Sequence, residues 1–248
     1  QRNRLSGSTE ESCHTCQHKF GNACLSRSGY KTMKVTYIEH MGSDLSVVNA
    51  ARVSFGKQSE LVCIDRQKGQ YILKEKDVNL IRYLAKHQHK SPFNHAFATF
   101  HVKAPIFVAR QLQKHEYMPW NEISRRYVDS EPEFYEPVVW RGRSEDKKQG
   151  SYGIVDLKTK PTHQYALQTY HNLLSDGVAP EQARMVLPQS MYTEWYWSGS
   201  LYAFSKMCSL RLKNDAQLET QVVAKQISNV MKDLFPFSWK ALGETNVT

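Results

Sequence analysis

The chain has 248 residues, of which 40% are hydrophobic and 23% charged, with a mean hydropathy of −0.59. This composition is typical of a globular protein and argues against a disordered chain or a membrane protein. No apolar run reaches the ~18 residues that a membrane-spanning helix needs, and no secretory signal is expected at the first residues. At this length we expect one large domain with a small appendage.

The charge balance predicts anionic partners. The chain carries 33 Lys and Arg against 24 Asp and Glu, a formal net charge of +9. Nucleic acid, a phosphorylated small molecule and an anionic membrane surface all fit this charge. Five cysteines, an odd number, argue against a full disulfide framework, so we expect a reducing, cytoplasmic setting.

The first part of the chain, residues 1–32, is predicted to be an extension separate from a catalytic domain at 33–248. It is rich in Ser, Gly, Cys, His and Lys and lacks periodic apolar residues. One interpretation is a tetrahedral zinc site. Its ligands would be Cys13, Cys16 and Cys24, with His18 or His14 as the fourth. The alternative is a flexible or incidental extension without metal.

The remaining elements are predicted from apolar spacing, caps and breakers. In the first part of the domain we expect a strand at 35–38, a helix at 44–55 with Asp44 as N-cap, a loop at 56–70 and a helix at 77–90 with Asp77 as N-cap. In the middle we expect a strand at 95–102, a helix from Pro105 to His115, a break at Pro119, an irregular segment at 121–128 leading into a strand, and a loop at 141–153. In the last part we expect a helix at 162–176 ended by Gly177, a helix at 180–186, a strand at 192–197, a helix after Ser200 and a final helix from Asp215 to about Phe235. Helices outnumber strands and the strands are irregularly separated, so the sequence predicts an α+β fold.

The densest cluster of functional residue types is the segment 110–127, RQLQKHEYMPWNEISRRY. On a helix, Gln111, Lys114 and His115 share one face and offer an amide, a cation and an imidazole to a nucleotide. After Pro119 the residues NEISRRY bring a carboxylate, a hydroxyl and two guanidiniums onto a turn, which suits phosphate. The alternative is an ordinary solvated amphipathic helix.

The order Lys114-His115-Glu116, seven residues, then Ser124 resembles the Arg-His-Arg-x7-Ser signature of flavin-dependent thymidylate synthases. Further blocks resemble that family in its order, over roughly residues 35 to 240. They are MGSDLSVVNAARVSF (41–55), HQHKSPF (87–93), FHVKAPIFVAR (100–110), EFYEP (133–137), ARMVLP (183–188) and LRLKNDAQLE (210–219). Ordered blocks of this kind are far more specific than a single motif.

The resemblance implies helices around a central antiparallel sheet, assembled as a homotetramer with active sites at subunit interfaces. It implies that dUMP becomes dTMP, with 5,10-methylenetetrahydrofolate as carbon donor and FAD, reduced by NADPH, as hydride donor. It also implies that no enzyme cysteine attaches to the pyrimidine. We expect Cys63 in a polar loop and Cys208 buried on the apolar side of a helix.

The resemblance also implies residue roles. Arg211 matches the arginine at the uracil edge, where a fixed cation stabilises negative charge on N3 and O2, and is the predicted catalytic residue. The residues matching dUMP contacts are Gln111, Lys114, Glu122, Ser124, Arg125, Arg126, Arg184 and Arg211. Those matching FAD contacts are Ser54, His89, Ser91, Lys114, His115, Glu116, Tyr117, Glu122, Ser200, Tyr202 and Lys206.

The chain departs from the family pattern mainly at the flavin contacts. Lys114 and Glu116 replace the two arginines of the signature, and Ser200, Tyr202 and Lys206 stand where Asn, Arg and Asn are common. Lys206 is a candidate to supply the missing charge near the FAD diphosphate. Two alternatives stay open: a basic nucleic-acid-binding protein with a zinc clip, and a degenerate family member that binds nucleotide without turnover. The first is disfavoured because carboxylates interrupt the basic cluster.

Overall fold

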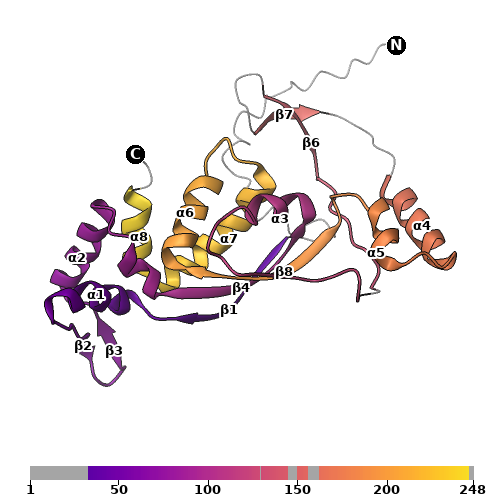
Figure 1. Ribbon diagram of the computed structural model, residues 1–248. Coiled ribbons are helices and arrows are strands. Elements are labelled where there is room, and N and C mark those ends of the chain that lie inside the picture. The colour runs from indigo at the N-terminus through magenta and orange to yellow at the C-terminus, as the bar shows by residue number, and fades with distance from the viewer. Residues whose placement is uncertain (1–32, 129, 145–149, 156–161, 246–248) are drawn as a thin grey trace, which may run out of the picture. The chain divides into compact units, whose positions relative to one another are not determined.

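The computed structural model describes residues 33–128, 130–144, 150–155 and 162–245 (Figure 1). Their centre is a four-stranded antiparallel sheet in the order β1-β4-β8-β5. The strands are β1 (Lys34–Met41), β4 (Phe97–Pro105), β8 (Tyr192–Ser200) and β5 (Trp120–Glu122). The expected α+β fold with an antiparallel sheet is confirmed. The predicted extension at 1–32 and its zinc ligands lie outside the described residues.

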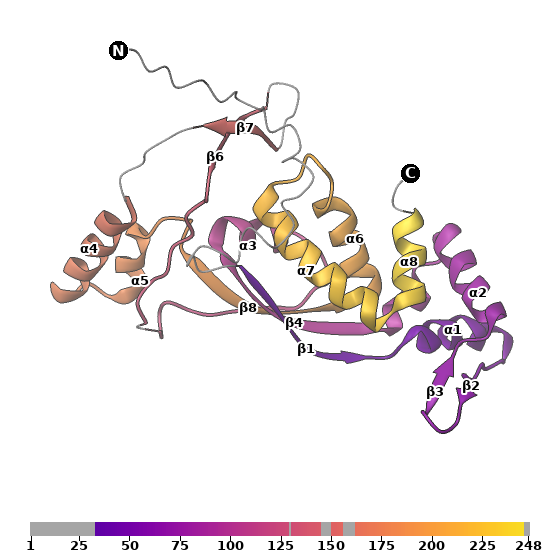
Figure 2. The same cartoon turned by 180° about the vertical axis from the view of Figure 1, so that it is seen from behind.

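Helices complete the fold, and Figures 1 and 2 show α6 and α7 over one face of β4 and β8. The helices are α1 (Asp44–Arg52), α2 (Glu75–Lys86), α3 (Ile106–Leu112), α4 (Thr162–Ser175), α5 (Pro180–Ala183), α6 (Leu201–Arg211), α7 (Leu218–Leu234) and α8 (Pro236–Thr245), with 3-10 turns η1 (Val53–Phe55), η2 (Ser91–His95) and η3 (Arg184–Val186). Within the described residues, no helix is long and apolar enough to cross a membrane.

The core lies between the sheet and these helices because the two inner strands alternate. In β4, Phe100 is buried while its neighbour His101 is half-buried on the opposite face. Phe204 of α6 packs edge-on against Phe100 and Trp197, with ring centroids 5.1 and 5.4 Å apart. Burying large aromatic side chains in this way contributes much of the apolar stabilisation of a domain.

Two predicted loops are wrong, because each contains a β-hairpin. Residues 56–70 include β2 (Val62–Asp65), which pairs with β3 (Gln70–Ile72), so Cys63 lies in a strand rather than a loop. Residues 141–153 overlap β6 (Trp140–Arg143) and β7 (Ser151–Val155). These short strands are largely exposed, so they lack the apolar alternation by which a strand is recognised.

Two predicted caps are also wrong. Asp44 is the first residue of α1, after the N-cap Ser43, and its carboxylate instead accepts hydrogen bonds from the Phe237 and Ser238 amides of α8 at 3.0 and 2.9 Å. Asp77 lies inside the first turn of α2, which begins after Lys74, and is fully buried. Both carboxylates therefore form tertiary contacts, which the local sequence does not reveal.

Several element boundaries also differ from the prediction. Helix α3 ends at Leu112, so the helical face expected to continue to His115 does not form. The irregular segment expected at 121–128 begins with strand β5, and α7 begins after Gln217 rather than at Asp215. Pro236 starts α8, a helix that the prediction missed, because proline is compatible with the first position of a helix.

The other predicted strands and helices are confirmed with shifts at their ends, except the strand expected after 121–128. Among the described residues 130–139 there is only an isolated bridge between Phe134 and Met191. Gly177 has a φ of 82° after α4, as a helix-ending glycine requires. The Ser200 side chain accepts a hydrogen bond from the Ala203 amide at 3.1 Å and caps α6. Cys208 is buried as expected, and burial raises the pKa of its thiol.

Candidate active site

A cavity of about 530 Å³ lies where the ends of α3 and α6 meet the start of α7 and the β6–β7 hairpin. Its lining residues are Gln111, Lys114, Arg141, Gly150, Ser151, Arg211 and Gln217. Three of these side chains are cationic and none is acidic. The cavity therefore suits a small anionic ligand, and its volume falls in the ~300–1,000 Å³ range of ligand pockets.

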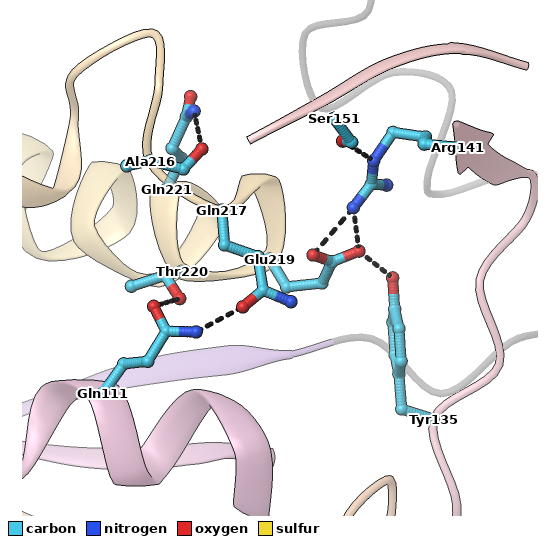
Figure 3. Close-up of polar contacts among 9 residues, drawn as sticks. All are labelled: Gln111, Tyr135, Arg141, Ser151, Ala216, Gln217, Glu219, Thr220 and Gln221. Atoms are coloured by element: carbon cyan, nitrogen blue, oxygen red, sulfur yellow. Dashed lines mark hydrogen bonds and ion pairs between the residues drawn. The ribbon is translucent and has the colours of Figure 1, made fainter. Parts of the chain in front are cut away.

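Two glutamines form one wall of this cavity (Figure 3). The Gln111 amide nitrogen donates to Oε1 of Gln217, and Gln111 Oε1 accepts from the Thr220 hydroxyl at 3.1 Å. Both ends of the Gln111 amide are therefore engaged, which determines its orientation. These two hydrogen bonds join the end of α3 to the start of α7.

Arg211 is held by two acceptors. Its Nε donates to Nε2 of His115 at 3.1 Å, and its Nη2 donates to the Gln111 carbonyl oxygen at 2.9 Å. Partial burial lowers the pKa of the guanidinium. The predicted residues Gln111, His115 and Arg211 therefore do meet, although α6 rather than a continued helix α3 brings them together.

His115 is neutral over the physiological range. Burial, followed by the positive charges of Arg211 and Lys206, lowers the pKa of its imidazole to about 4. A neutral imidazole accepts a hydrogen bond at one ring nitrogen, which matches the bond from Arg211. Two predicted groups, the flavin candidate Lys206 and the dUMP candidate Arg211, thus act on the same ring.

Replacing His115 with glutamine is expected to reduce the acid sensitivity of the fold. The unfolded imidazole has a pKa near 6.5 and the folded one about 4, so below pH 6.5 the unfolded state binds more protons. The natural chain therefore loses stability as the pH falls from 6.5 toward 4, and the variant loses less. Urea unfolding at pH 7 and pH 5 measures the difference. His171→Gln, a partly exposed histidine, is the control; equal acid losses in the natural chain and His115→Gln would contradict the prediction.

A second group of predicted dUMP residues lies outside the cavity. The Ser124 hydroxyl accepts from the Arg126 amide at 3.3 Å, and the Arg126 guanidinium pairs with Glu181 at 3.2 Å. The Arg184 Nε donates to the carbonyl oxygen of Glu181 at 3.3 Å. Arg125 donates to the Ser130 carbonyl oxygen. Arg126 and Arg184 both contact Glu181 and form an exposed arginine group, whereas Arg125 is half-buried, and none of the three lines the cavity of the same chain.

Glu122 is anchored to the sheet. Its carboxylate accepts from the Thr193 hydroxyl at 2.6 Å and from the Trp120 indole nitrogen at 3.1 Å. Thr193 lies on β8, which pairs with the Glu122 strand β5, and Trp120 lies on β5 itself, so the position of this carboxylate is set by the sheet. It does not line the cavity, and its predicted ligand contacts stay predictions.

The predicted flavin residues fall into separate places. His89 lies after α2, its ring stacked near Tyr83 at 6.1 Å, and the Lys90 ammonium lies 5.6 Å from the ring centroid of Tyr202. Ser91 begins η2, Ser54 lies in the exposed turn η1, and Lys206 is exposed on α6. Ser200 is buried, and its hydroxyl donates to Asn94 at 2.7 Å.

Glu116 and Tyr117 lie in the turn after α3. Tyr117 is 92% exposed and has a φ of 60°, a left-handed conformation that is uncommon for a residue with a side chain. Such strain persists where the surrounding structure imposes it, often at functional sites. Their predicted contacts with FAD stay predictions.

Arg141, Ser151 and Gln217 line the cavity but were not predicted as site residues. The first two lie in RGRSEDKKQGSYG, where dense charge indicated a loop. Gln217 lies in the block LRLKNDAQLE, and that block was the available signal. Among the described residues, no group of three or more His, Cys, Asp or Glu side chains is placed to hold a metal.

Fold and cavity together define an α+β protein with a cationic site for a small anionic ligand. The family model described as "Thymidylate synthase complementing protein" matches residues 36–237. The flavin-dependent thymidylate synthase of Thermus thermophilus is 40% identical over 215 residues, covering 85% of this chain and 75% of its own. That of Thermosipho africanus is 39% identical over 212 residues, covering 82% and 88%.

A solved structure agrees with these sequence matches. The UMP/dUMP methylase PolB from Streptomyces cacaoi, bound with 5-Br dUMP, superposes with a TM-score of 0.72 at 31% identity, covering 87% of this chain and 96% of that one. The chain belongs to the flavin-dependent thymidylate synthase family. It is therefore an enzyme of a flavin-dependent methyltransferase family, which favours this interpretation over the nucleic-acid-binding alternative.

Proposed function

We propose that this chain converts dUMP to dTMP with 5,10-methylenetetrahydrofolate as carbon donor and NADPH as reductant. In the overall reaction, dUMP, methylenetetrahydrofolate, NADPH and one proton give dTMP, tetrahydrofolate and NADP⁺. The observation that carries this proposal is the cationic cavity containing Gln111, Lys114 and Arg211, in a chain 40% identical to a flavin-dependent thymidylate synthase.

Arg211 is the residue to which we assign the main electrostatic role. Its two acceptors, His115 Nε2 and the Gln111 carbonyl oxygen, orient the guanidinium in the cavity wall. Placed at the uracil edge, it stabilises negative charge on N3 and O2 as C5 forms its new carbon bond. A cation oriented in advance stabilises such charge without reorganisation.

The exposed arginine group supports an assembly in which subunits share sites. Arg126 and Arg184 suit a phosphate by charge, yet they do not line the cavity of their own chain. In a homotetramer with sites at subunit interfaces, the arginines of one protomer would complete the cavity of another. We therefore include this assembly in the proposal.

Three of the predicted or neighbouring residues suit FAD by their chemistry, although none of them lines the cavity. Lys206 and Lys90 offer positive charge to a diphosphate, and Tyr202 offers an aromatic face. The charge of Lys206 acts on His115, which bonds Arg211, so the proposed flavin and nucleotide groups are neighbours. When bound, FAD supplies the hydride that completes the methyl group. This chain's residues hold it and the nucleotide together.

A second candidate substrate is the ribonucleotide UMP. PolB, whose structure matches this chain, is described as a UMP/dUMP methylase and is also solved with 5-Br UMP, at a TM-score of 0.70. The two substrates differ by one hydroxyl group on the sugar. Parallel assays therefore distinguish them.

The test uses the purified chain with FAD, NADPH and methylenetetrahydrofolate, and either dUMP or UMP. We expect a yellow protein and the formation of dTMP, detected by chromatography with mass spectrometry. Product from UMP alone would change the assigned substrate. Bound flavin with no product from either nucleotide would favour the degenerate family member.

The zinc site and the cytoplasmic setting stay predictions. Cys13, Cys16, His18 and Cys24 lie outside the described residues. Metal analysis of the full chain tests the zinc site, and a stoichiometry near zero would remove it.

A further inference from the structure

Arg141 of β6 lines the cavity, and none of the roles proposed above includes it. Its Nη2 donates to both carboxylate oxygens of Glu219, at 2.6 and 2.8 Å, and its Nε donates to the Ser151 hydroxyl at 2.7 Å (Figure 3). Among the described residues, these contacts leave Nη1 and its two N–H groups available. The cavity wall thus holds an oriented donor.

Glu219 is a fixed anchor for this guanidinium. It is 4% exposed, and the Tyr135 hydroxyl donates to its Oε1 at 3.1 Å. Burial first, and then the charge of Glu219, raises the pKa of Tyr135, so the phenol keeps its proton and remains a donor. A buried carboxylate held by several donors moves little. Arg141 therefore loses less conformational freedom on binding a ligand than a free arginine would.

The β6–β7 hairpin reaches the cavity mainly through polar and backbone contacts. All five residues of β7 are exposed, so little apolar packing holds the strand. Gly150 has a φ of 92°, and a Cβ atom there would lie 3.2 Å from the carbonyl oxygen of Asp215. This close approach and the Arg141–Glu219 pair bring the hairpin against the loop that precedes α7. The arrangement places Arg141 where it contributes to the cavity.

We propose that Arg141 is a further nucleotide-binding residue of this cavity and that Glu219 is the positioning residue that holds it there. Arg141 donates from Nη1 to an oxygen acceptor of the bound dUMP. Charge-assisted donors of this kind are stronger than neutral ones. The inference rests on the proposed function, because it takes the nucleotide as the occupant of the cavity.

The test is dUMP binding by the FAD-loaded enzyme, measured by isothermal titration calorimetry. Arg141→Gln is expected to raise Kd about tenfold to hundredfold, the effect of losing one charge-assisted hydrogen bond. The KM for dUMP rises in parallel while kcat at saturation is retained. Deoxyuridine as a second probe locates the contact. If Arg141→Gln loses affinity for both ligands, the contact is on the base or sugar. If it loses affinity for dUMP alone, the contact is on the phosphate.

The double variant Arg141→Gln with Glu219→Gln separates binding from folding, because it removes the buried carboxylate together with its partner. Weak dUMP binding in this variant supports the proposal, and a return to natural affinity overturns it. Arg143→Gln, an exposed arginine on the same strand, is the matched control and is expected to bind dUMP normally. If the natural enzyme binds no dUMP, the proposed function fails; if it binds dUMP and Arg141→Gln binds equally well, only this inference fails.

Discussion

Replacing Arg211 with glutamine is expected to lower the rate of dTMP formation by about a hundredfold to a thousandfold, the usual effect of removing one preorganised charge-stabilising donor. Glutamine keeps hydrogen-bonding groups but has no charge to offer the developing anion. The rate of Arg211→Lys is expected to lie between those of the natural enzyme and Arg211→Gln. Its ammonium keeps the charge but lacks the planar geometry by which the guanidinium reaches His115 and Gln111 together. Single-turnover assays at saturating dUMP measure this effect.

A second readout tests the same arrangement without activity. The charge of Arg211 contributes to lowering the pKa of His115, so Arg211→Gln should raise that pKa above about 4. NMR titration of the imidazole reports the shift. Lys213→Gln, an exposed cation just beyond α6, is the control and should change neither the rate nor the pKa. A rate for Arg211→Gln close to that of the natural enzyme would contradict the assigned role.

Replacing Arg52 with methionine is expected to lower the free energy of unfolding by about 3–5 kcal/mol, because it leaves a buried carboxylate without its cation. Asp77 is fully buried, and it accepts from Arg52 Nη2 at 2.5 Å, from Arg52 Nε at 3.1 Å and from the Ser59 hydroxyl at 2.9 Å. Chemical denaturation with urea measures the loss. The Arg52–Asp77 pair connects α1 to α2, and the Ser59 hydroxyl connects both to the segment before β2.

Two further variants make the stability test specific. Arg82→Met on the exposed side of α2 removes a hydrogen bond to Asn79 at 3.0 Å, the one side-chain hydrogen bond of Arg82 within the described residues, and is expected to change stability by less than about 0.5 kcal/mol. Arg52→Met combined with Asp77→Leu removes both charges and should recover most of the loss. An equal loss in Arg52→Met and Arg82→Met would show that the buried charge is not the cause.

Local pattern predicted most of the elements that pack on the core, although α8, which also packs there, was missed. Strand β4 was found because it is rich in aromatic and β-branched residues, and helix α6 because its apolar residues recur at helical spacing. The two exposed hairpins were missed, because pairing between their own backbones holds them and their side chains carry little apolar pattern. Asp44 and Asp77 were likewise predicted to cap nearby helices from their local position. In the structure their carboxylates instead bind residues distant in the sequence.

The residues of the site likewise fall into those predicted from the sequence and those found only in the structure. Gln111, Lys114, His115 and Arg211 were found from sequence because they lie in short dense motifs, and the cavity contains or adjoins all four. Arg141 was not found, since a guanidinium in a charged segment has the same local pattern whether it faces water or Glu219, 78 positions away. Which exposed arginines complete the cavity likewise depends on assembly rather than on one chain's sequence.

The sequence by itself determined that this is a basic α+β protein whose residues 36–237 carry the pattern of a flavin-dependent thymidylate synthase. That outcome follows because apolar periodicity and short motifs are local properties. Only the tertiary structure decided which cations line one 530 Å³ cavity, that Arg211 bonds a neutral His115, and that Glu219 holds Arg141 beside them. Those contacts join residues from separate helices and a hairpin, and burial alters their charges only after the chain has folded.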